Sequence, residues 1–251
     1  MKNEDIDLRE GYLMRSKVVD RLGNATKARE YLIRLQRQGS IRQVNKNIFV
    51  TLDKTNGQPL LTAYEVAMQL STDACISHLS ALYLHGCAIK EPTTVFITAS
   101  KKFQDLGYEE QIFHRMRKVG KTHLEERMGA VNISTYEQAV AECIHSFASN
   151  AMIKVYLSCL LGHGQLDNDA LCVVLKQYKS GHFFQKCGYI LEGLKQHLGI
   201  QESTLKFCQR RLPIAYRYMN FESGNVCHKR WRLYAKKYVG DYLTSLKNDK
   251  L

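Results

Sequence analysis

Residues 24–39 read NATKAREYLIRLQRQG, which is the pattern of one amphipathic helix. Asn24 is a residue type that caps helix N-termini, and Gly39 is one that ends helices. The face expected to be buried carries apolar residues at spacings of four and three, namely Ala28, Leu32 and Leu35. The opposite face is strongly basic and carries Lys27, Arg34, Arg37 and Gln38. Such a helix buries its apolar face and leaves its cations in solvent.

A shorter helix is expected before this one and a hairpin after it. Residues 17–22 predict the first helix, with Ser16 as its cap and Gly23 as its end. Residues 41–52 read IRQVNKNIFVTL, in which two β-prone runs flank a polar tip. Helix, turn, basic helix and basic-tipped hairpin follow one another in the order of a winged helix-turn-helix.

This order predicts a DNA-binding surface. In a winged helix the second helix enters the major groove, and the hairpin lies over the phosphate backbone. Arg34 and Arg37 are expected to donate to guanine edges, and Gln38 to address adenine. Phosphates are expected to be neutralised by Lys27, Arg42 and Lys46. A charged helix face is also compatible with plain solvation, and winged helices also bind proteins, so both alternatives stay open.

The charge of the chain agrees with a polyanionic partner. The 251 residues carry a formal net charge of +12, concentrated at two ends. Residues 15–54 hold ten Lys/Arg against three Asp/Glu, and residues 206–250 hold eleven against three. Such an excess raises the local concentration of nucleic acid or of anionic membrane around a protein.

The same composition argues against several other classes of protein. The eight cysteines are dispersed without any Cys-x-x-Cys pair, which favours buried thiols over a disulfide scaffold or a metal site. No apolar run approaches the roughly 20 residues of a membrane-spanning helix. The first ten residues are polar and acidic, unlike a signal peptide. We therefore expect a cytoplasmic protein without cofactor, metal ion or membrane contact.

A turn-rich break at residues 56–59, NGQP, suggests a domain boundary between residues 58 and 59. Beyond it, strand patterns cover residues 95–98, 111–116 and 130–133. Helical patterns cover residues 62–70, 136–149, 151–161, 169–179, 183–198 and 203–209. The predicted fold class is therefore α+β. A winged helix-turn-helix, residues 1–58, precedes a larger mixed domain, residues 59–251, with a small sheet and a helical C-terminal half.

One block in the second domain resembles a known family. Residues 76–82 read ISHLSAL, and His85-Gly86 follows after two more residues. This block resembles the AbiEi-like antitoxins, transcriptional regulators of abortive-infection and phage-defence systems, which carry it after an N-terminal winged helix. Weaker similarities follow in the family's order, at Gly188-Tyr189 with Glu192 and at Arg230-Trp231. Gln138 and Ala139 depart from the family's usual Glu-Arg-Thr-Leu segment. The matching residues are Ser77, His78, Ser80, His85, Gly86, Gly188, Tyr189, Glu192, Arg230 and Trp231.

The resemblance implies a type IV antitoxin. In this family the winged helix represses the protein's own operon by binding promoter DNA. The larger domain counteracts a nucleotidyltransferase-like toxin without needing a stable complex with it. The alternative is a stand-alone winged-helix regulator whose C-terminal domain senses a ligand or a partner.

Two further features have competing interpretations. Ser77, His78 and Ser80 are residue types used in nucleophilic catalysis, but no carboxylate stands at an obvious partnering position. We therefore predict that the protein is not an enzyme and that these residues are structural.

Residues 206–242 interleave cations with aromatic residues, which suggests either RNA contact or simply core aromatics with basic neighbours. The aromatic residues are Tyr216, Tyr218, Phe221, Trp231, Tyr234, Tyr238 and Tyr242.

Overall fold

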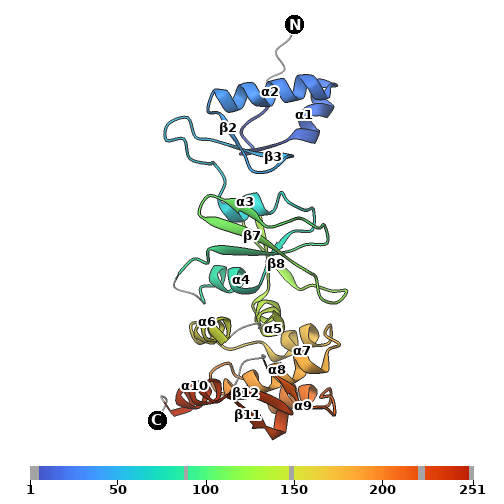
Figure 1. Cartoon of the computed structure of the whole chain (residues 1–251), viewed down its shortest axis with the longest axis vertical. Helices are drawn as coiled ribbons and strands as arrows, with labels where there is room; N and C mark the ends of the chain where they lie inside the picture. Colours follow the sequence, from blue (N-terminus) through green and yellow to red (C-terminus); the bar gives the residue numbers. More distant parts are fainter. Residues whose placement is uncertain (1–5, 88–89, 147–149, 220–223, 249–251) are drawn as a thin grey trace. The chain divides into compact units, whose positions relative to one another are not determined.

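The computed structural model describes residues 6–87, 90–146, 150–219 and 224–248 of a mixed α+β chain (Figure 1). Its helices and three sheets form two compact units. Unit 1 comprises Met1–Ile76, Thr93–Met116 and Met128–Asn132, and unit 2 comprises Ser77–Pro92, Arg117–Arg127 and Ile133–Leu251. The boundary expected between residues 58 and 59 lies within unit 1 and stays a prediction. None of the helices in the described part of the chain combines the length and apolar character that spanning a bilayer requires.

The N-terminal part of unit 1 has a β-α-α-β-β arrangement, compatible with a winged helix. Its elements are β1 (Tyr12–Met14), α1 (Arg15–Leu22), α2 (Ala25–Arg37), β2 (Ile41–Gln43) and β3 (Ile48–Thr51). The three strands form an antiparallel sheet in the order β1-β3-β2. Both predicted helices and the predicted hairpin are present. Strand β1 was not predicted, because its three residues become a strand only by pairing with β3.

Local capping explains where the second helix begins. The side chain of Asn24 accepts hydrogen bonds from the backbone N–H groups of Thr26 (2.8 Å) and Lys27 (3.1 Å), as its residue type predicts. The prediction that Ser16 caps α1 was wrong, because α1 begins at Arg15 directly after β1, with Met14 in the cap position. Pairing of Met14 with Ile48 holds that cap residue in an extended conformation.

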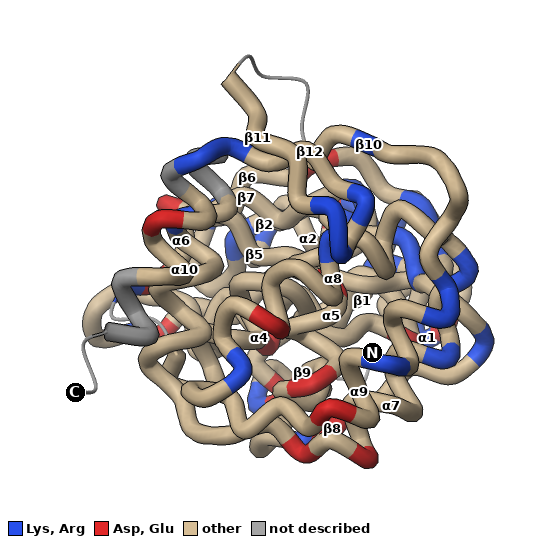
Figure 2. The backbone as a smooth tube through the Cα atoms, turned by 90° about the horizontal axis from the view of Figure 1, so that it is seen from below, with Lys and Arg blue, Asp and Glu red and all other residues tan. Residues whose placement is uncertain are grey.

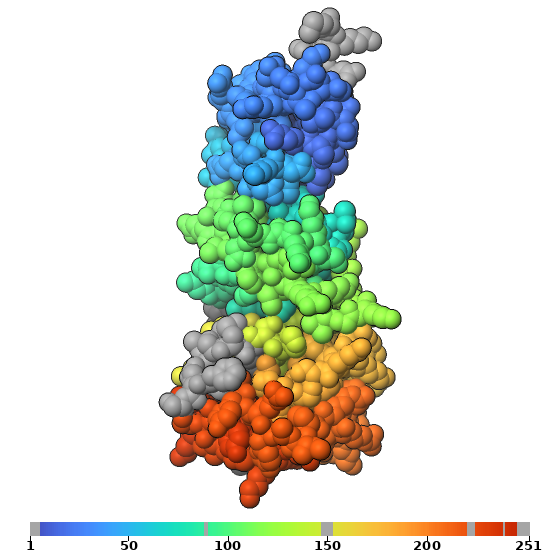
Figure 3. All heavy atoms as spheres, turned by 45° about the vertical axis from the view of Figure 1, so that its right-hand side comes forward, coloured from blue at the N-terminus to red at the C-terminus, as the bar shows by residue number. Residues whose placement is uncertain are grey.

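A small apolar core holds this segment together. Ala28 and Leu32 of α2 are fully buried against Val18 of α1 and Phe49 of β3. The atoms of this segment, coloured blue in Figure 3, pack closely against one another. The apolar face predicted from spacing is thus the face of α2 that is buried.

The rest of unit 1 adds a helix and part of a six-stranded sheet. Helix α3 (Ala63–Ala67) begins at Thr62, which forms a reciprocal capping box with Glu65. The six-stranded sheet has the order β6-β7-β5-β4-β9-β8. Its strands are β4 (Cys75–Ile76), β5 (Thr94–Thr98), β6 (Leu106–Tyr108), β7 (Gln111–Met116), β8 (Glu125–Met128) and β9 (Val131–Ser134). The three predicted strands are confirmed as β5, β7 and β9, while β4, β6 and β8 were not predicted.

Unit 2 is mainly helical. Its helices are α4 (His78–Leu84), α5 (Tyr136–Ser146), α6 (Asn150–Leu161), α7 (Asn168–Leu175), α8 (Gly181–Gly193), α9 (Glu202–Gln209) and α10 (Lys237–Asn248). A short 3-10 turn, η1 (Lys229–Trp231), precedes the last strand. The third sheet has the order β10-β12-β11, formed by β10 (Arg217–Tyr218), β11 (Asn225–His228) and β12 (Leu233–Lys236). The helical C-terminal half therefore also contains a sheet that the sequence pattern did not predict.

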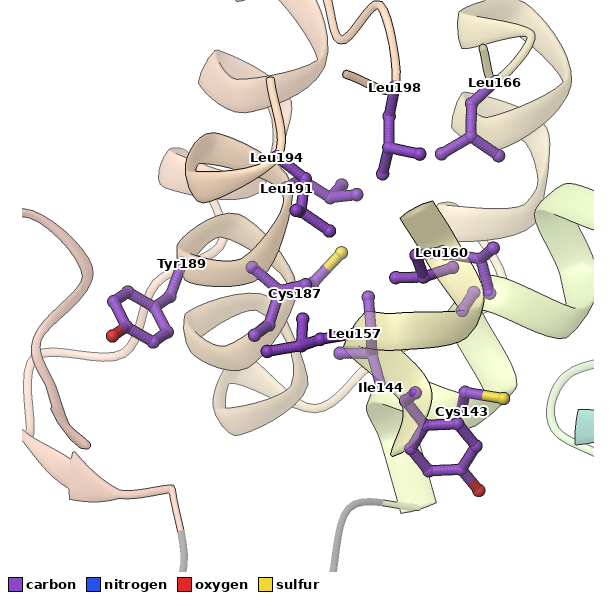
Figure 4. Close-up of a cluster of buried hydrophobic side chains, with 14 of the residues drawn as sticks. Cys143, Ile144, Leu157, Leu160, Leu166, Cys187, Tyr189, Leu191, Leu194 and Leu198 are labelled. Carbon is purple, nitrogen blue, oxygen red and sulfur yellow. The ribbon is translucent and has the colours of Figure 1, made fainter. Parts of the chain in front are cut away.

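The core of unit 2 lies between α5, α6 and α8. Ile144, Leu157, Cys187 and Leu191 from these helices point toward one another and are fully buried (Figure 4). Six of the eight cysteines are buried as free thiols, in line with the expected role as small apolar residues. Cys172 is partly buried and Cys227 is exposed.

Candidate functional site

The basic face of α2 is open to solvent. The predicted DNA-contacting residues Lys27, Arg34, Arg37, Gln38, Arg42 and Lys46 are all exposed. Burial of Ala28, Leu32 and Leu35 orients the helix, so the cations on its far side project outward. The Arg34 guanidinium lies over the ring of Tyr31, 5.1 Å from its centroid, which supports its extended side chain.

The hairpin carries the other two predicted DNA-contacting cations, Arg42 and Lys46, and their surroundings differ. Asn45 Oδ1 accepts hydrogen bonds from the backbone of Asn47 (2.8 Å) and Ile48 (2.9 Å), a tight turn that leaves Lys46 at the exposed tip. Arg42 instead forms an ion pair with Glu109, a contact that the sequence pattern did not predict. A phosphate that binds Arg42 would compete with this carboxylate for the guanidinium.

The residues of the family-like block lie at the start of α4, where most of them are buried. Ser77, His78 and Ser80 are almost inaccessible to solvent. The His78 ring makes hydrogen bonds at both nitrogens, with Ser77 Oγ at Nδ1 (2.9 Å) and with Ser146 Oγ at Nε2 (3.0 Å). His78 also has a left-handed backbone (φ 54°), a conformation uncommon outside glycine that the surrounding contacts must maintain.

A buried carboxylate stands at the centre of these contacts. Glu142 of α5 accepts hydrogen bonds from His123 Nε2 (2.7 Å), Ser134 Oγ (3.0 Å) and Gln138 Nε2 (3.2 Å). The backbone N–H of His78 also donates to it (3.3 Å). Glu142 therefore connects α4, the segment before β8, β9 and α5. We call the five residues His78, His123, Ser134, Gln138 and Glu142 the Glu142 network.

Electrostatics keep this carboxylate ionised. Burial raises the pKa of Glu142, but the His123 hydrogen bond and the imidazoles of His78 and His123 lower it more. The net effect is a pKa below the ordinary range of a glutamic acid. A buried carboxylate that is surrounded by donors is stable as the anion, whereas an unpartnered one would take up a proton.

The geometry of the Glu142 network supports a structural role. A serine, a histidine and a carboxylate are adjacent, as in a hydrolase, but Ser77, His78 and Glu142 are all at least 95% buried. Solvent has almost no access to these three side chains. Sequence inspection missed Glu142 and His123, although a carboxylate on the otherwise apolar face of a helix was an available signal. The absence of enzymatic activity stays a prediction.

The other two residues of the block complete α4. His85 Nε2 donates to the backbone carbonyl of Ser134 (2.8 Å), which satisfies that carbonyl group. Gly86 follows the helix with φ 78°, a left-handed conformation that ends helices and that glycine adopts at low cost.

The later family-like residues, far apart in the chain, form one cluster. Trp231 packs directly against Gly188 of α8, and its Nε1–H donates to Glu192 Oε2 (2.6 Å). Arg230 forms an ion pair with Glu192 and a second with Glu202 (3.1 Å). Tyr189 is buried beside His228, with ring centroids 4.4 Å apart. We call Gly188, Glu192, Arg230 and Trp231 the Trp231 cluster. Gly188 and Trp231 are buried in unit 2, whereas Glu192 is half-buried and Arg230 is exposed.

Comparison with known proteins yields a match of fold. Neither protein-family models nor curated proteins match this sequence. The crystal structure of the Rv2827c protein from Mycobacterium tuberculosis matches with a TM-score of 0.65. The match covers 96% of this chain and 90% of that one, at 12% sequence identity. At this identity the comparison establishes a fold like that of Rv2827c.

Proposed function

We propose that this protein is a winged-helix DNA-binding protein. The observation that carries the proposal is the exposed basic face of α2, oriented by its buried apolar face and followed by a hairpin with Lys46 at its tip. In a winged helix these are the elements that contact the major groove and the backbone. Arg34 and Arg37 have the bidentate donors that suit guanine edges, and Gln38 suits adenine.

We further propose that DNA binding represses the protein's own operon and that the protein acts as a type IV antitoxin. Support comes from the resemblance of residues 76–86 to the AbiEi-like antitoxins, together with the weaker similarities at Gly188 and Trp231. Of these residues, His78 belongs to the Glu142 network, and Gly188, Glu192, Arg230 and Trp231 form the Trp231 cluster. The toxin to be counteracted is a nucleotidyltransferase-like protein.

Replacing Arg34 and Arg37 together by alanine is expected to weaken binding to promoter duplex about 100-fold, because each bidentate pair contributes about 1–3 kcal/mol. Fluorescence anisotropy with duplex from upstream of the gene measures the effect. Arg29→Ala is the matched control, since Arg29 is also exposed on α2 but lies on another side of the helix. Equal losses in Arg29→Ala and in the double variant would contradict the assigned interface.

Antitoxicity is tested with the full chain and the neighbouring gene. We expect co-expression of the chain to restore colony formation when the neighbouring toxin is induced. The variant with Arg34→Ala and Arg37→Ala is expected to rescue equally well, because the proposed toxin-counteracting role lies outside α2. A toxic neighbour that the wild-type chain does not counteract would refute the antitoxin part and favour the stand-alone regulator.

A further inference from the structure

The sheet β10-β12-β11 has one packed face and one open face. Leu233 and Ala235 of β12 are fully buried, and this strand contacts α8 and α10. Tyr234 lies between them, so its side chain is on the opposite face, because successive residues of a strand alternate. The register pairs Tyr234 with Tyr218 of β10 and with Cys227 of β11. These three residues therefore share the open face.

Three tyrosine rings lie close together on this open face. The rings of Tyr218 and Tyr234 are stacked, with centroids 4.8 Å apart and planes inclined by 23°. The ring of Tyr216 follows at 5.9 Å from that of Tyr234. Tyr216 and Tyr218 are 45% and 51% exposed, so much of their aromatic surface is unused by the fold. We call Tyr216, Tyr218 and Tyr234 the tyrosine face.

A cation lies beside the tyrosine face. Lys236 lies two residues beyond Tyr234 on the same side of β12, whereas Arg217 stands between Tyr216 and Tyr218 and alternates to the opposite side of β10, in register with the buried Leu233. The described strands of this sheet contain no Asp or Glu. Lys and Arg positions are visible beside β10 and β12 in Figure 2. An aromatic surface with this charge is complementary to a polyanion that also has flat apolar groups.

We propose that the tyrosine face binds single-stranded nucleic acid. Unpaired bases stack on the exposed rings, while phosphates lie near Lys236. Base–aromatic stacking tolerates any sequence, because every base has a π-face. A duplex hides the faces of its bases inside the helix, so it does not provide this contact. This site lies outside the DNA-binding surface proposed for α2 and does not depend on it.

The structure separates the aromatic residues that the sequence had grouped. Trp231 belongs to the core, and Tyr242 is half-buried with its hydroxyl near Ser158 (3.4 Å). Phe221 and the side chain of Tyr238 lie outside the described residues. The site therefore rests on Tyr216, Tyr218 and Tyr234.

The test uses the full chain carrying Arg34→Ala and Arg37→Ala, which removes the main contacts proposed for duplex binding. Anisotropy is measured with labelled ten-nucleotide RNA, with DNA of the same sequence, and with the corresponding duplex. Adding Tyr218→Ala with Tyr234→Ala is expected to weaken binding of the single strands about tenfold or more. Tyr218→Phe with Tyr234→Phe should bind within about twofold of the parent, because the rings are kept.

Charge is tested with a matched pair of variants. Lys236→Gln is expected to weaken binding and to reduce its salt dependence by roughly one released ion. Lys176→Gln, at an exposed position after α7, should leave both unchanged. Circular dichroism verifies that each variant is folded.

Three outcomes would overturn the proposal. The folded alanine pair could bind single strands as tightly as the parent does. Single strands and duplex could lose affinity equally, which would exclude stacking as the cause. The alanine pair could instead convert a dimer into a monomer in sedimentation while no variant binds nucleic acid, which would make the face an interface between copies.

Tighter binding of RNA than of DNA would support the proposal and add a contact to the 2′-hydroxyl. Duplex binding by the wild-type chain tests the α2 surface separately.

Discussion

Replacing Glu142 by alanine is expected to lower the free energy of unfolding by about 3–5 kcal/mol. The substitution removes the acceptor that His123, Ser134, Gln138 and the backbone of His78 share. These donors are buried, so water does not replace the lost hydrogen bonds without opening the structure. Urea unfolding followed by the fluorescence of Trp231, the single tryptophan, measures the loss.

Glu142 also predicts a pH dependence of stability. The pKa of this carboxyl is lower in the folded protein than in the unfolded chain. Its contribution is therefore fully present above the unfolded pKa, about 4.3, and is lost as the pH falls through the lower folded value. Glu142→Gln should remove this part of the acid sensitivity, so the difference in stability between wild type and variant should shrink below about pH 4.3.

The matched control for both measurements is Glu126→Gln. Glu126 is a carboxylate of the same unit on β8, with a side chain that is 53% exposed, and its contact with His85 Nδ1 (3.7 Å) is at the surface, where ion pairs contribute about 0–1 kcal/mol. Surface substitutions of this kind usually change stability by less than about 0.5 kcal/mol. Glu142→Ala and Glu126→Gln variants of similar stability would refute the role assigned to the Glu142 network.

Gly188→Ala is expected to destabilise the protein by about 3 kcal/mol, at the upper end of overpacking effects. A Cβ atom at this position would lie 2.0 Å from Cζ3 of Trp231 and 2.3 Å from Cε3. The indole does not move away easily, because it is buried and its Nε1 is hydrogen-bonded to Glu192. The melting temperature should fall, and a red shift of the Trp231 emission should report displacement of the ring into solvent.

Two further variants separate the collision from general effects of the substitution. Gly164→Ala is the matched control, because an added Cβ there meets nothing within 4 Å, and we expect a change below about 0.5 kcal/mol. Trp231→Phe combined with Gly188→Ala should cost less than the sum of the two single changes, since the smaller ring relieves the contact. A Gly188→Ala variant that unfolds like wild type would show that the α8–Trp231 contact is looser than described.

Local sequence signals were sufficient for the helix that carries the proposed DNA-binding surface. The spacing of Ala28, Leu32 and Leu35 predicted the buried face of α2, and Asn24 predicted its start. The exposed cations follow from the same periodicity, because residues on the far side of a helix face solvent when one side is buried. Strands β5 and β7 were likewise visible as β-prone runs of five and six residues.

The short strands and the buried polar contacts had no comparable local signal. Strands β1, β10 and β12 have two to four residues each and exist because a distant segment supplies their hydrogen bonds. The Glu142 network joins residues 78, 123, 134, 138 and 142, and the Trp231 cluster joins residues 188 and 231. Periodicity and capping act between neighbours in the chain. The contacts of Glu142, and the contact of Trp231 with Gly188, depend instead on which distant segments meet. The packing of the whole unit decides this.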